Sequence, residues 1–379
     1  MLRYWTAGES HGKTLLALVD GFPAGISIDT ELIDTELARR QGGYGRGGRQ
    51  RIETDRVEVL TGIWKGRTLG SPIALQVINR DYKLEKLVDL ERPRPGHGDL
   101  TGSLKYLGPM RDILERASAR ETAARVAAGA LARQLLEPFG IRVLGYVVEL
   151  GGMELPPPQA GYEKRVRLRA ASRVYSLAPE RDQAVCDLID ETGKKGDTLG
   201  GIVEVTVSGL PFGLGTHTQW DLKLDGRIAQ AVMAVQAIKG VEIGMGFAAA
   251  RAPGSAVHDP IQFDASQQDQ PHLGYVRPTN NAGGLEAGMT NGQPVIVRAA
   301  MKPISTLRKP LESINLTTKR PESASYERSD VCAVSAASVI VENVVAFELA
   351  RAFTDKFGND SLDEIRARYD LYLELARQR

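Results

Sequence analysis

The sequence reads AGESHGKTLLALVDG at residues 7–21, and this stretch separates two fold classes. Its first eight residues match the loose phosphate-loop pattern, with Ala7 in place of the first glycine. A true phosphate loop leads into a helix that begins at the Lys-Thr pair, because the N-terminus of that helix holds the phosphates. The apolar run from Thr14 to Asp20 ends at Gly21, too early for that helix, and is typical of a strand. The stretch therefore favours an α/β fold without a phosphate loop, and an ATPase or kinase remains the alternative.

On both sides of this strand the chain alternates between strand-like and helix-like patterns. Further strands are expected at 57–63, 72–78 and 202–208. Helices are expected from Asp29 to about Arg40, from Ser118 to Phe139 and from Ser361 onward, and over 179–192, 220–239 and 335–357. Residues 80–109 and 303–329 show no periodicity, and loops of that length in a compact domain are usually functional or hide a missed element.

One short pattern occurs twice, each time after a strand-like run. These two G-x-P-x-G segments are GFPAG at residues 21–25 and GLPFG at residues 209–213. A few turn-forming residues are weak evidence for a repeat. Two similar turns is therefore the favoured interpretation, and a duplicated half of the chain is the alternative.

Composition limits the possible partners and the cellular compartment. The 379 residues are 42% hydrophobic, and 48 Lys and Arg nearly balance 47 Asp and Glu, for a net charge of +1. This balance argues against a protein that coats nucleic acid or a membrane with its whole surface. Two distant cysteines, Cys186 and Cys332, form neither a disulfide framework nor a zinc site, and no other metal-ligand spacing occurs. Without a signal peptide in 1–12 or a long apolar run, the expected location is cytoplasmic.

Arginine is concentrated in the first third of the chain. A glycine-rich loop follows the first expected helix, and glycines let such a loop fold around a small anion. Guanidinium groups bind carboxylate or phosphate through two parallel hydrogen bonds. An exposed basic loop or an RNA-binding RGG segment are alternatives, but one short GRGGR tract (45–49) without interleaved aromatic residues or net basic charge is poor evidence for RNA binding. A small polyanionic substrate is preferred, because the loop arginines are followed by more: Arg39, Arg40, Arg46, Arg49 and Arg51, then Arg92, Arg94, Arg111, Arg116 and Arg120.

Two histidines are candidate acids. His97 lies in a Pro/Gly segment and His11 between Ser10 and Gly12, rather than on apolar faces. The expected helix start at Ser118 is flanked by Arg116 and Arg120, and a positive helix end beside two guanidinium groups is a good anion site. The residues alone thus indicate an enzyme for a small, multiply anionic substrate, without identifying the reaction.

Seven short blocks carry a family resemblance. They are GESHG (8–12), RPGHGD (94–99), RASARET (116–122), AIKGVE (237–242), NAGG (281–284), KPIST (302–306) and RSD (328–330). In this order they resemble the signature blocks of the chorismate synthase family. Gly98 and Ala117 depart mildly from the family, where many members carry Ala and Ser, and neither change removes a group that the chemistry needs.

The resemblance implies a lyase that eliminates phosphate in a 1,4 sense from 5-enolpyruvylshikimate 3-phosphate and gives chorismate. This is the final step of the shikimate pathway to the aromatic amino acids. The substrate's two carboxylates and phosphate match the excess of arginines. The implied cofactor is reduced FMN, which lends electron density to the departing allylic phosphate and recovers it, so that no net redox change results.

The resemblance also implies roles for individual residues. Catalytic roles fall on Ser10, His11, His97 and Asp330: His11 protonates the leaving phosphate, His97 stabilises the reduced flavin near N1 and O2, and Asp330 helps take the proton from flavin N5. The substrate's anionic groups are assigned to Arg40, Arg46, Arg49, Arg94, Arg120 and Arg328. FMN contacts are assigned to Arg116, Ala117, Ser118, Gln236, Ala237, Ala287, Lys302, Pro303, Ile304, Ser305, Thr306 and Arg328.

The fold that the resemblance implies is a single α/β domain over residues 1–379. Two antiparallel four-stranded sheets sandwich helices in it, and the chain forms a homotetramer. The family also gives Arg40 and Arg46 a nicotinamide role, so substrate and NADPH both stand as their ligands. No G-x-G-x-x-G fingerprint follows a strand, which favours an external supply of reductant.

Overall fold

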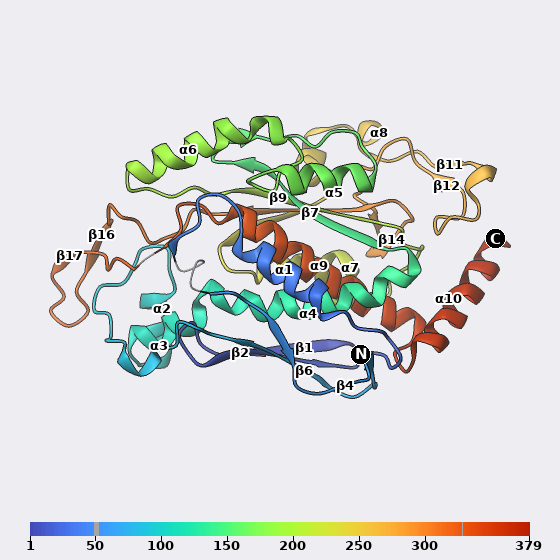
Figure 1. Ribbon diagram of the computed structural model, residues 1–379. Helices are drawn as coiled ribbons and strands as arrows, with labels where there is room; N and C mark the ends of the chain where they lie inside the picture. Colours follow the sequence, from blue (N-terminus) through green and yellow to red (C-terminus); the bar gives the residue numbers. More distant parts are fainter. Residues whose placement is uncertain (49–52, 328) are drawn as a thin grey trace.

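Two antiparallel sheets enclose a layer of helices in the computed structural model, which describes residues 1–48, 53–327 and 329–379 (Figure 1). The first sheet has the strand order β1 (Arg3–Ala7), β2 (Thr14–Asp20), β6 (Ile73–Ile78), β3 (Val57–Val59). The second has the order β10 (Ile238–Ile243), β15 (Val295–Met301), β9 (Gly201–Ser208), β7 (Arg142–Leu150), β8 (Met153–Glu154). Between the sheets lie α1 (Thr30–Gln41), α4 (Thr122–Leu136), α7 (Leu224–Met233) and α9 (Val334–Phe357).

Smaller elements lie at the two ends and outside the second sheet. Outside that sheet are α5 (Tyr162–Ala171) and α6 (Asp182–Lys194), and α10 (Leu362–Arg377) extends at one end (Figure 1). At the other end, on the left of the view, lie α2 (Asp99–Tyr106), α3 (Met110–Ala117) and the hairpin β16 (Glu312–Ile314)–β17 (Pro321–Ser323). The remaining elements are the hairpins β4 (Ile63–Trp64)–β5 (Arg67–Thr68), β11 (Gln262–Phe263)–β12 (Tyr275–Val276) and β13 (Leu285–Glu286)–β14 (Met289–Thr290), and α8 (Gly254–Val257).

The expectation of two four-stranded sheets is wrong for the second sheet, which has five strands. The additional strand is β8, which follows β7 after a tight turn and pairs Met153 with Leu150. The turn consists of Gly151 and Gly152, whose φ angles of 59° and 84° are both positive. Such a turn matches the right-handed twist of a hairpin, and glycine adopts it without strain.

The two halves of the chain repeat one arrangement. The order β1-β2-β6-β3 in the first sheet corresponds, in the same chain order, to β7-β9-β15-β10 in the second. Both G-x-P-x-G segments are closed in the same way: Thr68 Oγ1 donates to Pro23 O at 2.6 Å, and Thr290 Oγ1 donates to Pro211 O at 2.6 Å. The structure therefore favours a duplicated half of the chain over the interpretation of two similar turns alone.

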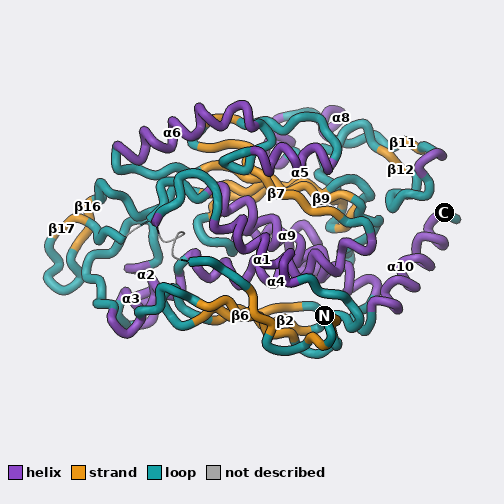
Figure 2. Tube along the Cα trace, in the orientation of Figure 1, coloured by secondary structure: helices purple, strands orange, loops and turns teal. Residues whose placement is uncertain are grey.

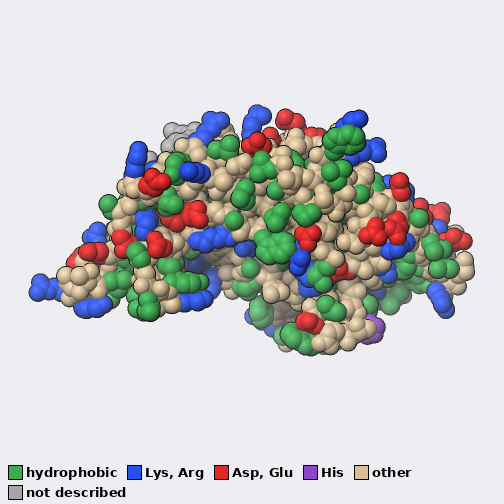
Figure 3. All heavy atoms as spheres, turned by 90° about the horizontal axis from the view of Figure 1, so that it is seen from below, with side chains coloured by type: hydrophobic (Ala, Val, Ile, Leu, Met, Phe, Trp, Pro, Cys, Tyr) green, Lys and Arg blue, Asp and Glu red, His purple; other side chains and the backbone are tan. Residues whose placement is uncertain are grey.

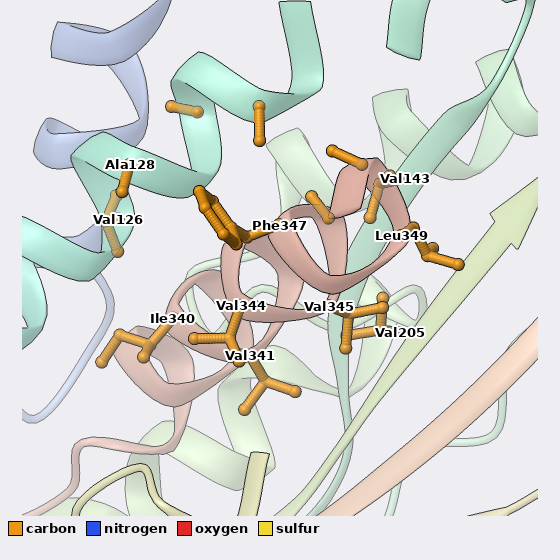
Figure 4. Packing of buried hydrophobic residues seen from close by; sticks show 14 of the residues in the cluster. Val126, Ala128, Val143, Val205, Ile340, Val341, Val344, Val345, Phe347 and Leu349 are labelled. Carbon is orange, nitrogen blue, oxygen red and sulfur yellow. The ribbon is translucent and has the colours of Figure 1, made fainter. Parts of the chain in front are cut away.

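The core lies where α4 and α9 cross between the sheets. Figure 4 shows Phe347 of α9 directed toward Val126 and Ala128 of α4, and Val345 beside Val205 of β9. The helices approach so closely that a Cβ on residue 129 would lie 2.2 Å from Asn343 O, which explains why glycine occupies that position. This close packing fixes the relative positions of the two helix N-termini, on which the candidate site depends.

Most expected elements are confirmed. The strand Thr14–Asp20 and the helix capped by Asp29 are present, as are the helices at 122–136, 182–194, 334–357 and 362–377. The long helix expected at 220–239 is wrong, because α7 ends at Met233 and Ala237, with φ 67°, turns the chain into β10. The segment 57–63 splits into β3 and the start of β4. Periodicity also missed α2 within 80–109 and the β16–β17 hairpin within 303–329.

In the part of the chain that the structure describes, no helix combines the length and apolar character needed to cross a membrane.

Candidate active site

The candidate site lies at the end of the molecule where both central helices begin. Ser118 precedes α4 and Asp330 precedes α9, while Asn79 and Lys302 directly follow the equivalent strands β6 and β15. Figure 2 shows these connections as teal loops on the left, near α2, α3 and the β16–β17 hairpin. Seen from below in Figure 3, Lys and Arg side chains gather around a hollow on the same side. Two helix N-termini and clustered cations favour binding of an anion.

The loop that carries Ser10 and His11 connects β1 directly to β2. Asn79 holds it from inside, with Nδ2 donating to Glu9 O at 3.1 Å and to Gly12 O at 2.8 Å. Ser118 Oγ lies 3.1 Å from Ser10 Oγ. Because a strand rather than a helix begins at Thr14, this loop lacks the helix N-terminus of a phosphate loop. The alternative of an ATPase or kinase built on this loop is thereby excluded.

His11 is paired with a carboxylate that we did not predict. Its Nδ1 lies 3.0 Å from Oε1 of Glu115, and its backbone N–H donates to Oε2 of Glu115 at 2.8 Å. On the other side of the ring, Nε2 lies 3.8 Å from Oδ2 of Asp81. Burial alone would raise the pKa of Glu115, but the hydrogen bonds from His11 outweigh it and leave the pKa below its usual value.

His97 is also paired with a carboxylate, but in a different electrostatic setting. Its Nδ1 lies 2.6 Å from Oδ1 of Asp99, which also accepts from Arg94 NH2 at 3.0 Å. The backbone N–H and Nε of Arg94 donate to the other Asp99 oxygen at 3.1 and 2.8 Å, and Arg94 NH1 donates to Thr306 Oγ1 at 2.9 Å. Burial alone would raise the pKa of Asp99, yet hydrogen bonds from His97 and Arg94 hold it well below its usual range.

The other expected substrate arginines are held by this chain's own carboxylates. Asp55, fully buried, accepts from Arg40 NH2 at 2.6 Å and from Arg120 NH1 at 2.6 Å. Arg46 NH1 lies 2.9 Å from Oδ2 of Asp330. Burial and the nearby charges of Arg120 and Arg46 lower the pKa of Arg40 to about 10 in spite of Asp55. Nitrogen atoms remain buried without a hydrogen-bond partner among the described residues: Arg40 Nε, Arg46 Nε and Arg120 NH2.

The expected FMN residues fall into one main group. Lys302 Nζ donates to Gly96 O at 2.8 Å, next to His97, and Lys302 N donates to Ala237 O at 2.9 Å. Gln236 Nε2 donates to Glu121 Oε2 at 3.2 Å. Ala117 ends α3 between Arg116 and Ser118, and Pro303, Ile304, Ser305 and Thr306 continue the loop after Lys302. Arg116 donates to Gly8 O at 3.1 Å and to Thr6 O at 2.9 Å, at the base of the His11 loop.

One expected FMN residue lies elsewhere, and two fall outside the described residues. Ala287 lies in the turn between β13 and β14. Gly284, just before β13, lies against the backbone of Pro294 and Val295 at the start of β15, whereas Lys302 follows the end of β15. A seven-residue strand spans roughly 20 Å, so Ala287 and Lys302 are far apart within one chain. Arg49 and Arg328 lie outside the residues that the structure describes.

A cavity of about 560 Å³ adjoins the site without containing either histidine. It shares Arg46 with the site, and Lys194 and Arg308 are further cations on its wall. Its other lining residues are Gly43, Tyr44, Gly45, Ile189, Asp190, Gly193 and Val331. Among the described residues, no group of three or more His, Cys, Asp or Glu side chains has an arrangement suited to a metal ion.

The family model described as chorismate synthase matches residues 2–354 of this chain. The chain belongs to the chorismate synthase family. It is 53% identical to a chorismate synthase of Geobacter metallireducens over 100% of both chains, and 55% identical to one of Trichlorobacter lovleyi over 98% of both. A solved structure titled "Crystal Structure of Chorismate Synthase" matches with a TM-score of 0.82 and 42% identity, over 100% of this chain and 99% of that one. The resemblance stated from the sequence is therefore confirmed.

Sequence reasoning missed four buried polar residues that organise the site of this family member: Asn79, Asp55, Asp99 and Glu115. Two of them gave a signal that was not used. Asp99 is the last residue of the block RPGHGD, and Glu115 directly precedes the block RASARET. Asp55 and Asn79 lie outside every block, and only the fold brings them against Arg40 and Arg120.

Proposed function

We propose that this member of the chorismate synthase family eliminates phosphate from 5-enolpyruvylshikimate 3-phosphate at the end of the molecule where α4 and α9 begin. Membership of the family gives the chain its activity, the conversion of 5-enolpyruvylshikimate 3-phosphate to chorismate, and its class, lyase. The proposal concerns the location, the residues and the cofactor. The observation that carries it is the convergence of two imidazole–carboxylate pairs and several buried arginines on two helix N-termini.

The arginines orient the substrate through its three anionic groups. Arg40, Arg46 and Arg120 each retain a buried N–H group without a partner, and such groups gain strongly when an anion supplies an acceptor. Asp55 and Asp330 hold these side chains in place in the absence of substrate. Pre-ordered donors lower the entropy that substrate binding would otherwise lose.

His11 is the acid for the departing phosphate. As the allylic C–O bond breaks, its electron pair goes to the phosphate oxygen, which takes the Nε2 proton of His11. The electron pair of the substrate C–H bond that also breaks provides the second double bond of the ring, and its proton goes to a base. The ring is left neutral, with its Nδ1 proton directed to Glu115, and it regains a proton from solvent after the products leave. Ser10, held against Ser118 at 3.1 Å, fixes the loop that presents this imidazole.

The residues near Lys302 fit a reduced flavin mononucleotide. Gln236 Oε1 is a buried acceptor without a hydrogen-bond partner among the described residues. The hydrogen bond from Nε2 to Glu121 fixes the orientation of the amide, so Oε1 is available to accept from an N–H group of the flavin ring. Burial and the charge of Lys239 lower the pKa of Lys302, and an anionic ring or phosphate bound nearby would stabilise the charged form of this side chain. Reduced FMN, when bound, supplies electron density to the breaking C–O bond. His97 lies beside Lys302 through Gly96 and would balance negative charge on that ligand, and Asp330 would accept a proton.

The distant position of Ala287 supports an assembly of more than one copy of the chain, and the family resemblance implies a homotetramer. If the Ala287 turn contacts FMN as the resemblance implies, the turn that does so comes from another copy of the chain. The whole chain is proposed to form one domain, since α9 packs against strands of the second sheet and against α1 and α4. NADPH as reductant and a cytoplasmic location stay predictions.

Flavin binding tests the placement of the cofactor. Lys302→Met removes a cation of the proposed site, while Lys309→Met removes an exposed one from the same long segment. Anaerobic titration with reduced FMN should show weaker binding to the Lys302 variant and unchanged binding to the Lys309 variant. Equal affinity in all three proteins would place the flavin elsewhere, and sedimentation of the wild type as a monomer would contradict the tetramer.

A further inference from the structure

We propose that Glu115 is a positioning residue that orients His11 and keeps its imidazole protonated for transfer to the departing phosphate. The proposal rests on the function proposed above and deepens it. Glu115 itself touches neither substrate nor cofactor in this account; it acts through His11.

Glu115 holds His11 through two contacts and the preceding residue, Ser10, through a third. Glu115 Oε1 lies 3.0 Å from His11 Nδ1, and Oε2 accepts the His11 backbone N–H at 2.8 Å. The backbone carbonyl of the same glutamate accepts the N–H of Ser10 at 2.8 Å. The side chain of Glu115 is only 2% exposed, and it anchors the loop that carries Ser10 and His11 to the last turn of α3. Nδ1 of His11 therefore donates its proton in a hydrogen bond to Glu115, and Nε2 is the nitrogen that can face a ligand.

The two histidines differ in how far the charge of the paired carboxylate is balanced by other groups. Asp99 receives three hydrogen bonds from Arg94, so its negative charge is already balanced by a guanidinium. The negative charge of Glu115 is balanced less by a neighbouring cation. Arg111 NH1 lies 3.7 Å from Glu115 Oε1, beyond hydrogen-bond distance, and Arg111 NH2 bonds to Glu327 at 3.0 Å. The negative charge of Glu115 therefore acts chiefly on the imidazole of His11, whereas Asp99 mainly orients the imidazole of His97.

The other charged groups near His11 are paired with groups of opposite charge. Asp81 lies 3.8 Å from Nε2, but Lys83 Nζ donates to it at 2.9 Å. On α3, Arg111 NH2 bonds to Glu327 at 3.0 Å. The hydrogen bonds from His11 lower the pKa of Glu115 against the effect of burial, so this side chain is a carboxylate and places a negative charge 3.0 Å from His11 Nδ1.

The first test is an NMR titration of the ligand-free protein. The chain has five histidines, so the His11 signal can be assigned by comparison with His11→Ala. Glu115→Gln keeps the shape and one acceptor oxygen but removes the charge. The titration midpoint of His11 should move to lower pH by about 1 unit, the usual size of a close charge effect. Asp99→Asn should leave the His11 midpoint unchanged. Equal His11 midpoints in wild type and Glu115→Gln would overturn the proposal.

A second variant gives an effect of opposite sign. Arg111→Gln removes the competing cation, so the His11 midpoint should rise, a result that simple loosening of the structure does not produce. A fall in both variants would overturn the electrostatic role. This variant also keeps the proposal testable if Glu115→Gln fails to fold.

The pH profile of turnover links the effect to catalysis. An acid must be protonated, so activity falls on the alkaline side as His11 loses its proton, and that limb should move to lower pH in Glu115→Gln. A shifted NMR midpoint with an unshifted turnover profile would show that Glu115 controls His11 but that His11 is not the acid, which would refute the proposed function rather than the pairing. An unshifted midpoint would refute the pairing itself.

Discussion

Oδ1 of Asp99 lies 2.6 Å from Nδ1 of His97, and the Asp99 side chain is fully buried. Because Asp99 is fixed by Arg94, the ring of His97 can hardly rotate, and its Nε2 has one direction in which to point. An imidazole held in this way can stabilise negative charge on a neighbouring ligand without reorganising. The pair thus supports a role for His97 toward the reduced flavin.

Replacement of His97 by Ala should therefore weaken binding of reduced FMN more than binding of oxidised FMN. Reduced flavin carries negative charge near N1, and a nearby imidazolium attracts it in a partly dry site. Anaerobic titration with both redox forms measures the difference. His258→Ala, in a loop far along the sequence, is the control and should bind both forms as the wild type does. Equal losses for the two redox forms in His97→Ala would contradict this role.

Replacement of His11 by Ala should lower turnover while leaving flavin binding intact. Loss of a general acid typically costs on the order of 10²–10⁴-fold. The measurement is turnover with photoreduced FMN, together with the affinity for FMN. Near-normal turnover would remove His11 from the mechanism, and a flavin affinity that falls as it does in His97→Ala would show that the two roles are wrongly assigned.

Replacement of Asp55 by Asn should destabilise the protein, since it leaves Arg40 and Arg120 buried without their shared counter-charge. Removing one partner of a buried ion pair typically costs about 3–5 kcal/mol. Urea unfolding measures the change. Asp20→Asn, which breaks the exposed pair with Arg3, should change stability by less than about 1 kcal/mol. Similar changes in the free energy of unfolding for the two substitutions would show that the buried ion pairs stabilise the protein no more than the exposed pair does.

Acid should destabilise the protein through Glu36, which bonds Arg39 at 2.6 Å and lies 3.1 Å from Arg133 between the central helices. Burial opposes ionisation, but the charges of Arg133 and Arg39 outweigh it and lower the pKa of Glu36 to about 2. A folded-state pKa below the unfolded value stabilises the protein above pH 4.5, and this stabilisation is lost as the pH falls toward 2. Urea midpoints between pH 7 and roughly 2 should fall more steeply in wild type than in Glu36→Gln. Parallel curves would contradict the argument.

The sequence predicts β2, β9, α1, α4 and α9 because their signals are local, whereas β1, β7 and β15 were not expected. Alternating apolar residues and the closing glycine predict β2, and Asp29 caps α1 through a hydrogen bond of 2.9 Å to the N–H of Glu31. The error at 220–239 has a tertiary cause. Residues 238–243 pair with β15, and this pairing overrides the helical pattern once Ala237 has turned the chain. The fifth strand, β8, was missed because two residues carry no periodicity.

The site was predicted in part for a similar reason. Histidines and arginines are visible as unusual residues in glycine-rich segments, and the family blocks supply their roles. Their partners are ordinary acids until the fold brings them close: Asp55 is 65 positions from Arg120, and Glu115 is 104 positions from His11. Burial, which makes these pairs strong, cannot be read from either segment alone.

The central claim is that this chain eliminates phosphate with the help of a reduced flavin that is not consumed. The direct measurement is anaerobic turnover of 5-enolpyruvylshikimate 3-phosphate with photoreduced FMN, following chorismate, phosphate and flavin redox state together. The account predicts equal amounts of chorismate and phosphate, many times the amount of FMN present, with the flavin still reduced at the end and no product when the flavin is oxidised. Absence of chorismate, or oxidation of one flavin for each chorismate formed, would contradict it.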